Sequence, residues 1–460
     1  MEAAFRRFLM LGTLALLGCT ATPDVLVIRD VTVIDGTGAL PRAGLSVLVE
    51  GGRIIALGPA DSVPSPRSAV TVDGTGRFLI PGLWDMHVHL RDLEGTLPLF
   101  VANGVTTVRD MGSVLEETVA LRAAVDEGVA VGPRILTAGM AVESRSWVAQ
   151  YVELMRQQGS DQEEINAFLR TRILVGDTLE ARAVVDSLRR GGADFIKIRH
   201  AESPAVFAAL GAAAEAAGTH LAGHYVWILG LDESAEFGQR SIEHNVLPGF
   251  NQRPPDQKQA IFDAFRRNGT HLVPTLVTNA AETMPLDEVR RFVEDDGGRL
   301  DPRNRYVSRA IRQSWQETVD LNARDTERPP PEVIRQMMAG SNDFLLEAWQ
   351  ASVPIMAGTD APTTGTFFGF SLHDELVLLV ETFGMTPMEA LQSATAVPAS
   401  FMGLDASAGT IAVGMRADLV LLNADPLADI ANTREIEAVI AGGRLYDRAA
   451  RERLLVASER

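Results

Sequence analysis

The chain has 460 residues, an apolar content of 46% and a formal net charge of −18. This length is sufficient for a large hydrophobic core and a second, smaller domain. The acidic balance argues against nucleic-acid binding, which needs a basic face to displace counterions from phosphates. Cys19 is the single cysteine, so an intrachain disulfide is excluded.

Residues 1–18 have the layout of a secretory signal. Two arginines precede an apolar run over residues 8–17, which is too short to span a bilayer as a mature helix. The run ends in Leu-Leu-Gly-Cys, which resembles the lipobox of bacterial lipoproteins. The resemblance implies that Cys19 is lipidated and anchors an exported protein to a membrane surface of the bacterial cell envelope, facing the periplasm or in the outer membrane. An ordinary cleaved signal peptide is the alternative.

Both ends of the mature chain have the sequence pattern of β-strands joined by turns. Short alternating apolar segments joined by Gly-rich turns run from residue 25 to residue 80, and similar segments return between residues 409 and 443. A long middle region separates the two ends. The sequence therefore predicts one small β-sandwich domain built from residues 19–80 and 405–460.

The middle of the chain alternates between short apolar runs and segments of helical composition. Eight such runs are predicted to be strands: 79–90, 104–109, 134–138, 195–198, 220–224, 241–244, 271–276 and 354–360. Eight strands that alternate with helices indicate an α/β fold, a parallel (β/α)8 TIM barrel over residues 81–404. Several runs end in His or Asp, where the carboxyl ends of barrel strands would gather reactive groups.

Residues 280–350 are too many for an ordinary connection between two barrel elements. They are rich in charged residues and include helical stretches over 304–321 and 331–349. We expect a helical insertion over the barrel mouth, either as a lid or as a solvated decoration.

His87 and His89 lie at the end of the first predicted strand. Residues two apart on a strand project to the same face, so both imidazoles can bind one metal ion. The pair alone is a weak signal, because a buried and satisfied histidine pair is the simpler alternative. Further candidate ligands follow other predicted strands: Lys197, His224, His244 and Asp360.

This order of residues resembles the amidohydrolase superfamily, especially its imidazolonepropionase-like and Xaa-Pro or Xaa-Arg dipeptidase branches. The resemblance covers nearly the whole mature chain. The stretches that carry it are 80–83 leading into His87 and His89, 104–110, 241–244, 358–360, 409–411 and 417–420.

The resemblance implies two divalent metal ions. His87, His89 and Asp360 would bind one ion, and His224 and His244 would bind the other. Lys197, carboxylated by carbon dioxide, would bridge the two ions. Imidazole and carboxylate ligands suit zinc best among common metals. The alternative is a one-metal site in which Lys197 ends in solvent or pairs with an acid.

The same resemblance implies that a hydroxide bridging the metals attacks an amide carbonyl, with Asp360 passing the proton to the leaving nitrogen. The predicted function is cleavage of an amide bond in a dipeptide or N-acyl amino acid, with a small-molecule substrate. Hydrolysis of cyclic amides or lactones is the alternative activity. A non-catalytic surface lipoprotein of the same fold is the alternative from another class.

Substrate contacts are predicted at four further positions. Tyr225 follows a ligand histidine, Arg199 and His200 follow Lys197, and His373 opens the helix after the eighth strand. For His373, capping of that helix is an equal alternative. Residues 139–147 depart from the Gly-Gly-His-like turn of many relatives, so we expect a different pocket wall.

Overall fold

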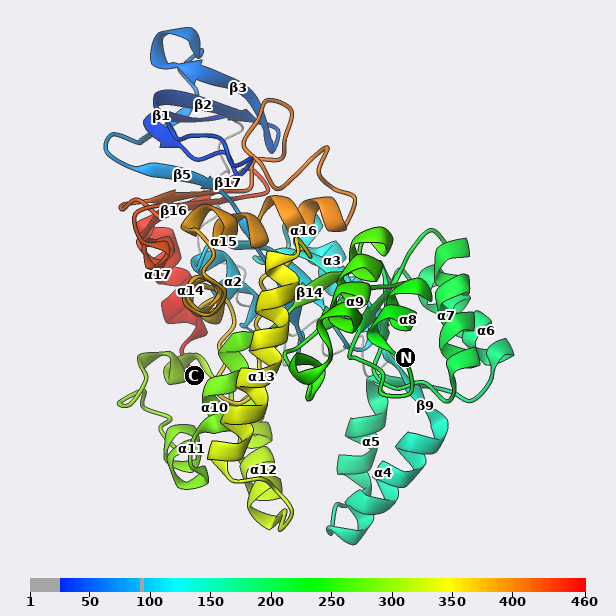
Figure 1. Cartoon of the computed structure of the whole chain (residues 1–460). Coiled ribbons are helices and arrows are strands. Elements are labelled where there is room, and N and C mark those ends of the chain that lie inside the picture. The colour runs from blue at the N-terminus through cyan, green and yellow to red at the C-terminus, as the bar shows by residue number, and fades with distance from the viewer. Residues whose placement is uncertain (1–24, 92–94) are drawn as a thin grey trace.

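The structure is a computed structural model that describes residues 25–91 and 95–460. The predicted signal and Cys19 lie outside the described residues. A β domain stands at one end of the molecule and a larger α/β domain at the other (Figure 1). Within the described ranges, no helix is both long and apolar enough to cross a bilayer.

The β domain combines strands from the two ends of the chain. Hydrogen bonds join its strands into one sheet, in which β5 from the first part pairs antiparallel with β15 from the second. Leu26, Leu79 and Leu419 belong to a core that both parts share. The strands are β1 (Val25–Val33), β2 (Arg42–Glu50), β3 (Arg53–Pro59), β4 (Val70–Asp73), β5 (Phe78–Pro81), β15 (Leu419–Leu422), β16 (Ile436–Ala441) and β17 (Arg444–Tyr446).

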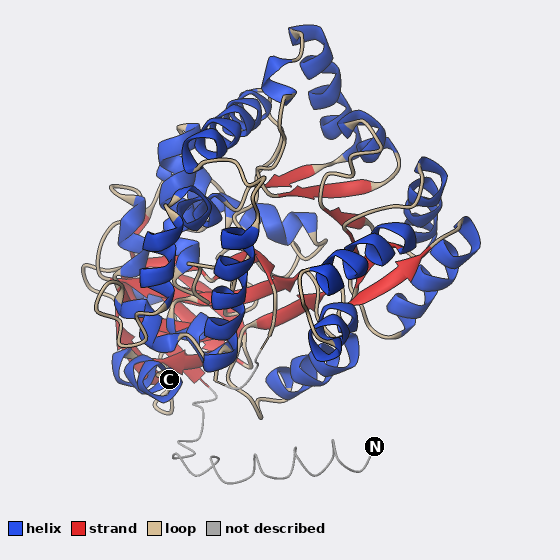
Figure 2. Ribbon diagram, turned by 90° about the horizontal axis from the view of Figure 1, so that it is seen from below, coloured by secondary structure: helices blue, strands red, loops and turns tan. Residues whose placement is uncertain are grey.

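Parallel strands form the interior of the larger domain, and helices surround them (Figure 2). The expected (β/α)8 barrel with a β domain built from both termini is confirmed. The barrel region contains β6 (Leu83–Val88), β7 (Val105–Asp110), β8 (Arg134–Thr137), β9 (Ala141–Ser144), β10 (Arg172–Val175), β11 (Ile196–Ile198), β12 (Leu221–Gly223), β13 (Gln239–Glu243) and β14 (His271–Val273).

The eighth barrel position differs from the expected strand over residues 354–360. This segment makes isolated parallel bridges, from Ile355 to Leu272 of β14 and from Ala361 to Val88 of β6. Asp360 has a left-handed φ of 55°, which interrupts an extended strand. The segment still closes the barrel between β14 and β6.

The helices occupy the outside of the barrel and its insertions. They are α2 (Leu97–Ala102), α3 (Leu115–Asp126), α4 (Arg145–Gln157), α5 (Gln162–Arg170), α6 (Thr178–Arg190), α7 (Pro204–Ala216), α8 (Leu231–Glu236), α9 (Pro255–Asn268), α10 (Asn279–Thr283), α11 (Leu286–Val293), α12 (Arg309–Arg324), α13 (Pro331–Gln350), α14 (Ser371–Phe383), α15 (Pro387–Ser393), α16 (Ala396–Phe401) and α17 (Arg448–Ser458).

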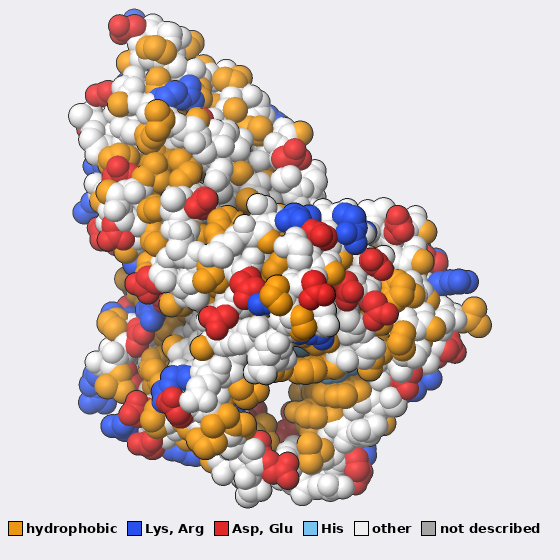
Figure 3. Space-filling view, viewed as in Figure 1, with side chains coloured by type: hydrophobic (Ala, Val, Ile, Leu, Met, Phe, Trp, Pro, Cys, Tyr) orange, Lys and Arg blue, Asp and Glu red, His pale blue; other side chains and the backbone are white. Residues whose placement is uncertain are grey.

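Two helical projections extend from the barrel on the side away from the β domain (Figure 1). One is the pair α4 and α5, and the other is formed by α10 to α13. A hollow with many apolar side chains around it separates them on the face seen in Figure 3. The second projection is not a solvated decoration, because Trp315 of α12 is buried in the barrel's core cluster and donates a hydrogen bond to Pro362 O.

Candidate metal centre

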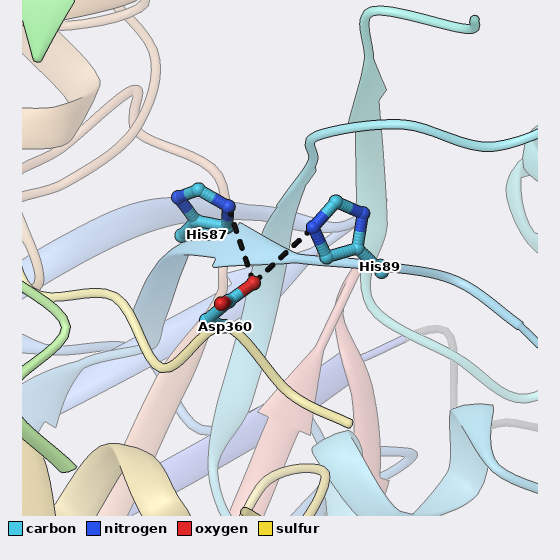
Figure 4. Close-up of side chains that lie close together, drawn as sticks. All are labelled: His87, His89 and Asp360. Carbon is cyan, nitrogen blue, oxygen red and sulfur yellow. Dashed lines mark ion pairs between the residues drawn. The ribbon is translucent and has the colours of Figure 1, made fainter. Parts of the chain in front are cut away.

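The carboxyl end of β6 and the eighth segment bring three predicted ligands together (Figure 4). Asp360 Oδ1 lies 3.3 Å from His87 Nε2 and 3.2 Å from His89 Nε2. The ligand atoms of His87, His89 and Asp360 all lie within 4.8 Å of one another. These side chains have the types and the spacing of a site that can hold a metal ion.

The histidine tautomers also suit a cation. His87 Nδ1 lies 2.8 Å from Glu243 Oε2, and His89 Nδ1 lies 3.3 Å from the carbonyl oxygen of Gly112. Each Nδ1 therefore carries the proton that it donates, which leaves Nε2 as the lone-pair atom that faces Asp360. His87 Nε2 and Asp360 Oδ1 are buried without a hydrogen-bond partner among the described residues. Two facing acceptor atoms with no proton between them fit a bound cation.

Three more predicted ligands adjoin this group. The ring centroid of His244 lies 4.6 Å from that of His87 and 4.9 Å from that of His224. His244 Nδ1 lies 3.8 Å from Asp360 Oδ2 and 3.0 Å from Thr275 Oγ1. Burial, together with the nearby positive charge of Lys197, holds the pKa of the His87 and His224 imidazoles well below the ordinary value. Neutral imidazoles are the form that binds metals.

Lys197 is the central residue of β11 and is fully buried. Its Nζ has no hydrogen-bond partner among the residues that the structure describes. Burial lowers the pKa of Lys197 to about 8, so the neutral amine is far more accessible than in a solvent-exposed lysine. The structure therefore does not support the alternative in which this side chain ends in solvent.

Strained backbone holds the ligands at the strand ends. Within the described ranges, five non-glycine residues have a left-handed φ, and three of them are His244, Thr275 and Asp360. Such conformations cost about 1–3 kcal/mol each and persist only where the surroundings enforce them. For Asp360 the enforcing contact is adjacent: Thr359 donates hydrogen bonds from N and Oγ1 to the buried carboxylate of Asp85, at 3.0 and 2.7 Å.

Two residues without a role in the sequence prediction orient the ligands. Glu243 at the end of β13 receives His87 Nδ1 on one oxygen and Arg109 on the other, where the guanidinium lies 2.7 Å away. Arg109 also donates to the carbonyl of Met86 at 2.6 Å, and its side chain is completely buried. A carboxylate that holds the non-ligating nitrogen of a histidine raises its basicity and fixes its ring. A charged pair inside apolar strands is the signal that could have identified these residues.

Two of the predicted substrate contacts have their polar atoms engaged by other parts of the chain. His373 is buried, with Nδ1 3.0 Å from Thr433 Oγ1 and Nε2 3.0 Å from Asn103 O. Both ring nitrogens are used in packing α14. The hydroxyl of Tyr225 donates a hydrogen bond to Leu229 O at 2.8 Å, four residues further along the same loop.

Arg199 and His200 belong to a second polar cluster beside Lys197. Glu143 of β9 is fully buried, and its Oε2 lies 2.7 Å from His200 Nδ1. Its Oε1 lies 3.4 Å from the Nε atoms of both Arg172 and Arg199. The indole of Trp147 stacks on the His200 ring at 3.9 Å between centroids. Glu143 and Arg172 of this cluster belong to β9 and β10, which pair in parallel.

A (β/α)8 barrel with His, Lys and Asp side chains at the carboxyl ends of its strands defines the class of barrel hydrolases with a metal site. The Amidohydrolase family matches residues 78–446, and the chain belongs to this family. It is a hydrolase that acts on carbon–nitrogen bonds.

Several relatives are similar over most of their length. An imidazolonepropionase from Streptomyces griseus is 26% identical over 416 residues, which are 87% of this chain and 90% of the relative. One from Ralstonia nicotianae is 28% identical over 86% of this chain and 90% of its own.

Solved structures share the same architecture. A putative prolidase from Bifidobacterium longum superposes with a TM-score of 0.69 at 25% identity, over 95% of this chain and 99% of that one. A Xaa-Pro dipeptidase with bound methionine in its active site shares the fold, with a TM-score of 0.68 at 23% identity, over 92% of this chain and 100% of that one.

Proposed function

We propose that this protein hydrolyses an amide bond in a dipeptide or N-acyl amino acid at a centre of two divalent ions, with zinc as the best match. His87, His89 and Asp360 would hold one ion, and His224 and His244 the other. The observation that carries the proposal is the fully buried Nζ of Lys197, which has no hydrogen-bond partner in residues 25–91 and 95–460.

Lys197 fits the role of a carboxylated bridging ligand. An ammonium group has three donors and no acceptor, so it cannot bind a cation. Reaction of the neutral amine with carbon dioxide forms a carbamate, which is anionic and has two oxygen acceptors. Arginine has no comparable chemistry at neutral pH. The lowered pKa of Lys197, caused by burial, favours the amine that this reaction needs.

The side chains around the proposed metal centre have two further roles, proton transfer and positioning of the ligands. Bound divalent ions supply an activated water and polarise a carbonyl oxygen. Asp360 lies beside both histidine pairs and can accept a proton at Oδ2 and transfer it to a leaving nitrogen. Glu243 and Asp85 hold the ligand strands in place.

The cluster at Glu143 supports a substrate with a free carboxylate. The terminal nitrogens of Arg199 make no hydrogen bond to a described residue. Its Nε lies 3.4 Å from Glu143 Oε1 without a hydrogen bond, and the other oxygen of Glu143 lies 2.7 Å from His200 Nδ1. Arg199 follows Lys197 by two residues at the end of β11. A guanidinium fork matches the two oxygens of a carboxylate.

Hydrolysis of a cyclic amide or lactone is the second candidate. It is favoured by the imidazolonepropionases, which match the chain over most of its length. The same activated water and the same proton transfer would open a ring carbonyl.

A substrate panel with the metal-loaded protein tests these proposals. It contains an N-acyl amino acid, the carboxamide of the same compound, and a lactam and a lactone. We expect the acid to be cleaved with kcat/KM about 10- to 100-fold above its carboxamide, as one charge-assisted bidentate contact predicts. Arg199→Gln should reduce this preference, while Arg156→Gln on exposed α4 should preserve it. Ring opening without release of an amino acid would select the second candidate.

We also infer that the protein is exported and anchored by a lipid at Cys19. The arginines before residues 8–17 and the Leu-Leu-Gly-Cys ending support this proposal. Mass spectrometry of the mature N-terminus should find a diacylglyceryl-modified Cys19. An unmodified residue at that position, or retention of residues 1–18, would contradict it.

A further inference from the structure

A second charged cavity lies between the β domain and the barrel. It has a volume of about 520 Å³ and is lined by Thr106 and Arg134 of the barrel and by Arg416, Asp418 and Arg444 of the β domain, among others. Arg134 is the first residue of β8, whereas His87 and His89 lie at the carboxyl end of β6. The cavity therefore lies at the opposite end of the barrel from the candidate metal centre.

The cavity has more positive than negative side chains. Four arginines and two aspartates line it, an excess of two positive charges in a chain whose formal net charge is −18. The lining charges are Arg53, Arg134, Arg416, Arg444, Asp126 and Asp418. Cavities of this size at domain junctions are common sites for small ligands.

The nearby aspartates offset the charge of Arg134 only in part, because its pKa stays lowered although Asp418, Asp126 and Asp194 raise it. Asp418 is already engaged, because its Oδ2 accepts from Arg416 Nε at 3.2 Å and its Oδ1 accepts from Gly442 N at 2.6 Å. Asp126 is exposed at the end of α3. Burial and repulsion from Arg416 both lower the pKa of Arg134. The two guanidinium groups thus repel each other across the junction.

Two buried polar atoms of the lining have no partner among the described residues. They are Arg134 Nη1 and the hydroxyl oxygen of Thr106, whose side chain is 2% exposed. The guanidinium groups of Arg53 and Arg444 instead donate hydrogen bonds to backbone carbonyl oxygens. Arg53 donates to Gly414 O at 2.8 Å, and Arg444 donates to Gly128 O at 3.2 Å. One nitrogen of each of these two guanidinium groups is therefore already used, whereas no described residue uses Arg134 Nη1.

We propose that this junction cavity binds a small oxyanion, a phosphate or carboxylate group, between the guanidinium groups of Arg134 and Arg416. The anion's oxygens accept from donors of both domains, since Arg134 belongs to the barrel and Arg416 to the β domain. Guanidinium groups bind such groups through paired N–H donors. Binding offsets the repulsion between the two arginines and links the β domain to the barrel.

The test uses the metal-loaded full chain with inorganic phosphate or succinate as the probe and sodium chloride at matched ionic strength as the reference. Thermal unfolding and isothermal titration are measured for wild type and for four variants. Arg134→Gln removes the unpartnered guanidinium. Arg67→Gln is a matched control at an exposed arginine of the β domain. Arg199→Gln tests whether the probe binds at the metal centre instead of the junction cavity. Asp126→Asn removes one negative charge from the lining.

We expect saturable stabilisation of wild type by at least one probe, with the same affinity in Arg67→Gln and Arg199→Gln. Arg134→Gln should bind at least about tenfold more weakly, as loss of a charged hydrogen-bond donor predicts, and Asp126→Asn more tightly. A non-saturable rise in Tm that is equal in all variants would be a general salt effect and would overturn the proposal. Unchanged affinity in Arg134→Gln, or no saturable binding of either probe, would overturn it too.

Discussion

Glu243 holds the ring of His87 from the opposite strand, with 2.8 Å between Oε2 and Nδ1. The contact joins the end of β13 to the end of β6, although the two residues are far apart in the sequence. One carboxylate thereby fixes both the tautomer and the orientation of a metal ligand.

Glu243→Gln should weaken metal binding by about 10- to 100-fold, because the amide offers one acceptor oxygen to three donors, which are His87, Arg109 and Ser241. It should also lower the free energy of unfolding by about 3 kcal/mol, since Arg109 would remain buried without its counter-charge. Metal titration and urea unfolding measure the two effects. Glu236→Gln, an exposed change on α8, should alter neither. Unchanged metal affinity in Glu243→Gln would refute the orienting role.

Asp360→Asn should retain the metal and lose turnover. An amide cannot accept the proton, and a positioned acid or base contributes about 10²- to 10⁴-fold to a rate. Steady-state kinetics and metal analysis on the same sample separate loss of chemistry from loss of metal. Asp320→Asn is the matched control, at a half-exposed position of α12 where the side chain pairs with Arg290. Full activity in Asp360→Asn would contradict the assignment.

Lys197→Arg should reduce the metal content from two ions per chain to one or fewer, because a guanidinium does not form a carbamate under these conditions. The chain's other lysine provides the control. Lys258 pairs with Glu347 at 2.6 Å on the outside of the barrel, and Lys258→Arg preserves that pair and should retain both ions. Elemental analysis after incubation with bicarbonate and metal measures the content. A wild-type value of one ion, unchanged by bicarbonate, would exclude the bridged centre.

The buried His373 predicts acid sensitivity of the fold. Burial lowers its pKa to about 4, whereas the unfolded chain titrates near the ordinary value of 6.5. Between these values the unfolded state binds more protons, so the stability contributed by the neutral ring is complete above pH 6.5 and is lost as the pH falls towards 4. The loss amounts to about 3 kcal/mol.

Urea unfolding between pH 4 and 7 measures this slope. His373→Gln should be less stable at pH 7, since it disturbs the contacts to Thr433 and Asn103, but its free energy of unfolding should depend less on pH by about 3 kcal/mol over this range. An identical slope in wild type and variant would show that other groups cause the acid sensitivity.

Much of the fold could be predicted because the buried parallel strands are short apolar runs between segments of helical composition. The expected strands at 104–109 and 134–138, for example, correspond to β7 and β8. The eighth strand was less regular than its sequence suggested. Its geometry depends on hydrogen bonds from Thr359 to Asp85, a long-range contact that no local pattern reveals.

Part of the candidate site, like part of the fold, could be predicted from the sequence. His87 and His89 could be predicted as ligands from their two-residue spacing and Asp360 from the family resemblance, and the structure brings the three side chains together. Glu243 and Glu143 could not be given roles, because burial of a carboxylate depends on partners from other strands. The hydrogen bonds of His373 to Thr433 and Asn103 could not be predicted either, since both partners are distant in the sequence.

The inserted segment over residues 141–175 has a consequence for how this enzyme can diversify. It supplies Glu143, Trp147 and Arg172 to one wall, whereas the metal ligands come from other segments of the barrel. The proposed recognition site is thus shared between this segment and the strand that carries Lys197, because Arg199 and His200 both lie against Glu143. Exchange of residues 141–175 alone between related enzymes would change the partners of Arg199 and His200 while every metal ligand stayed in place.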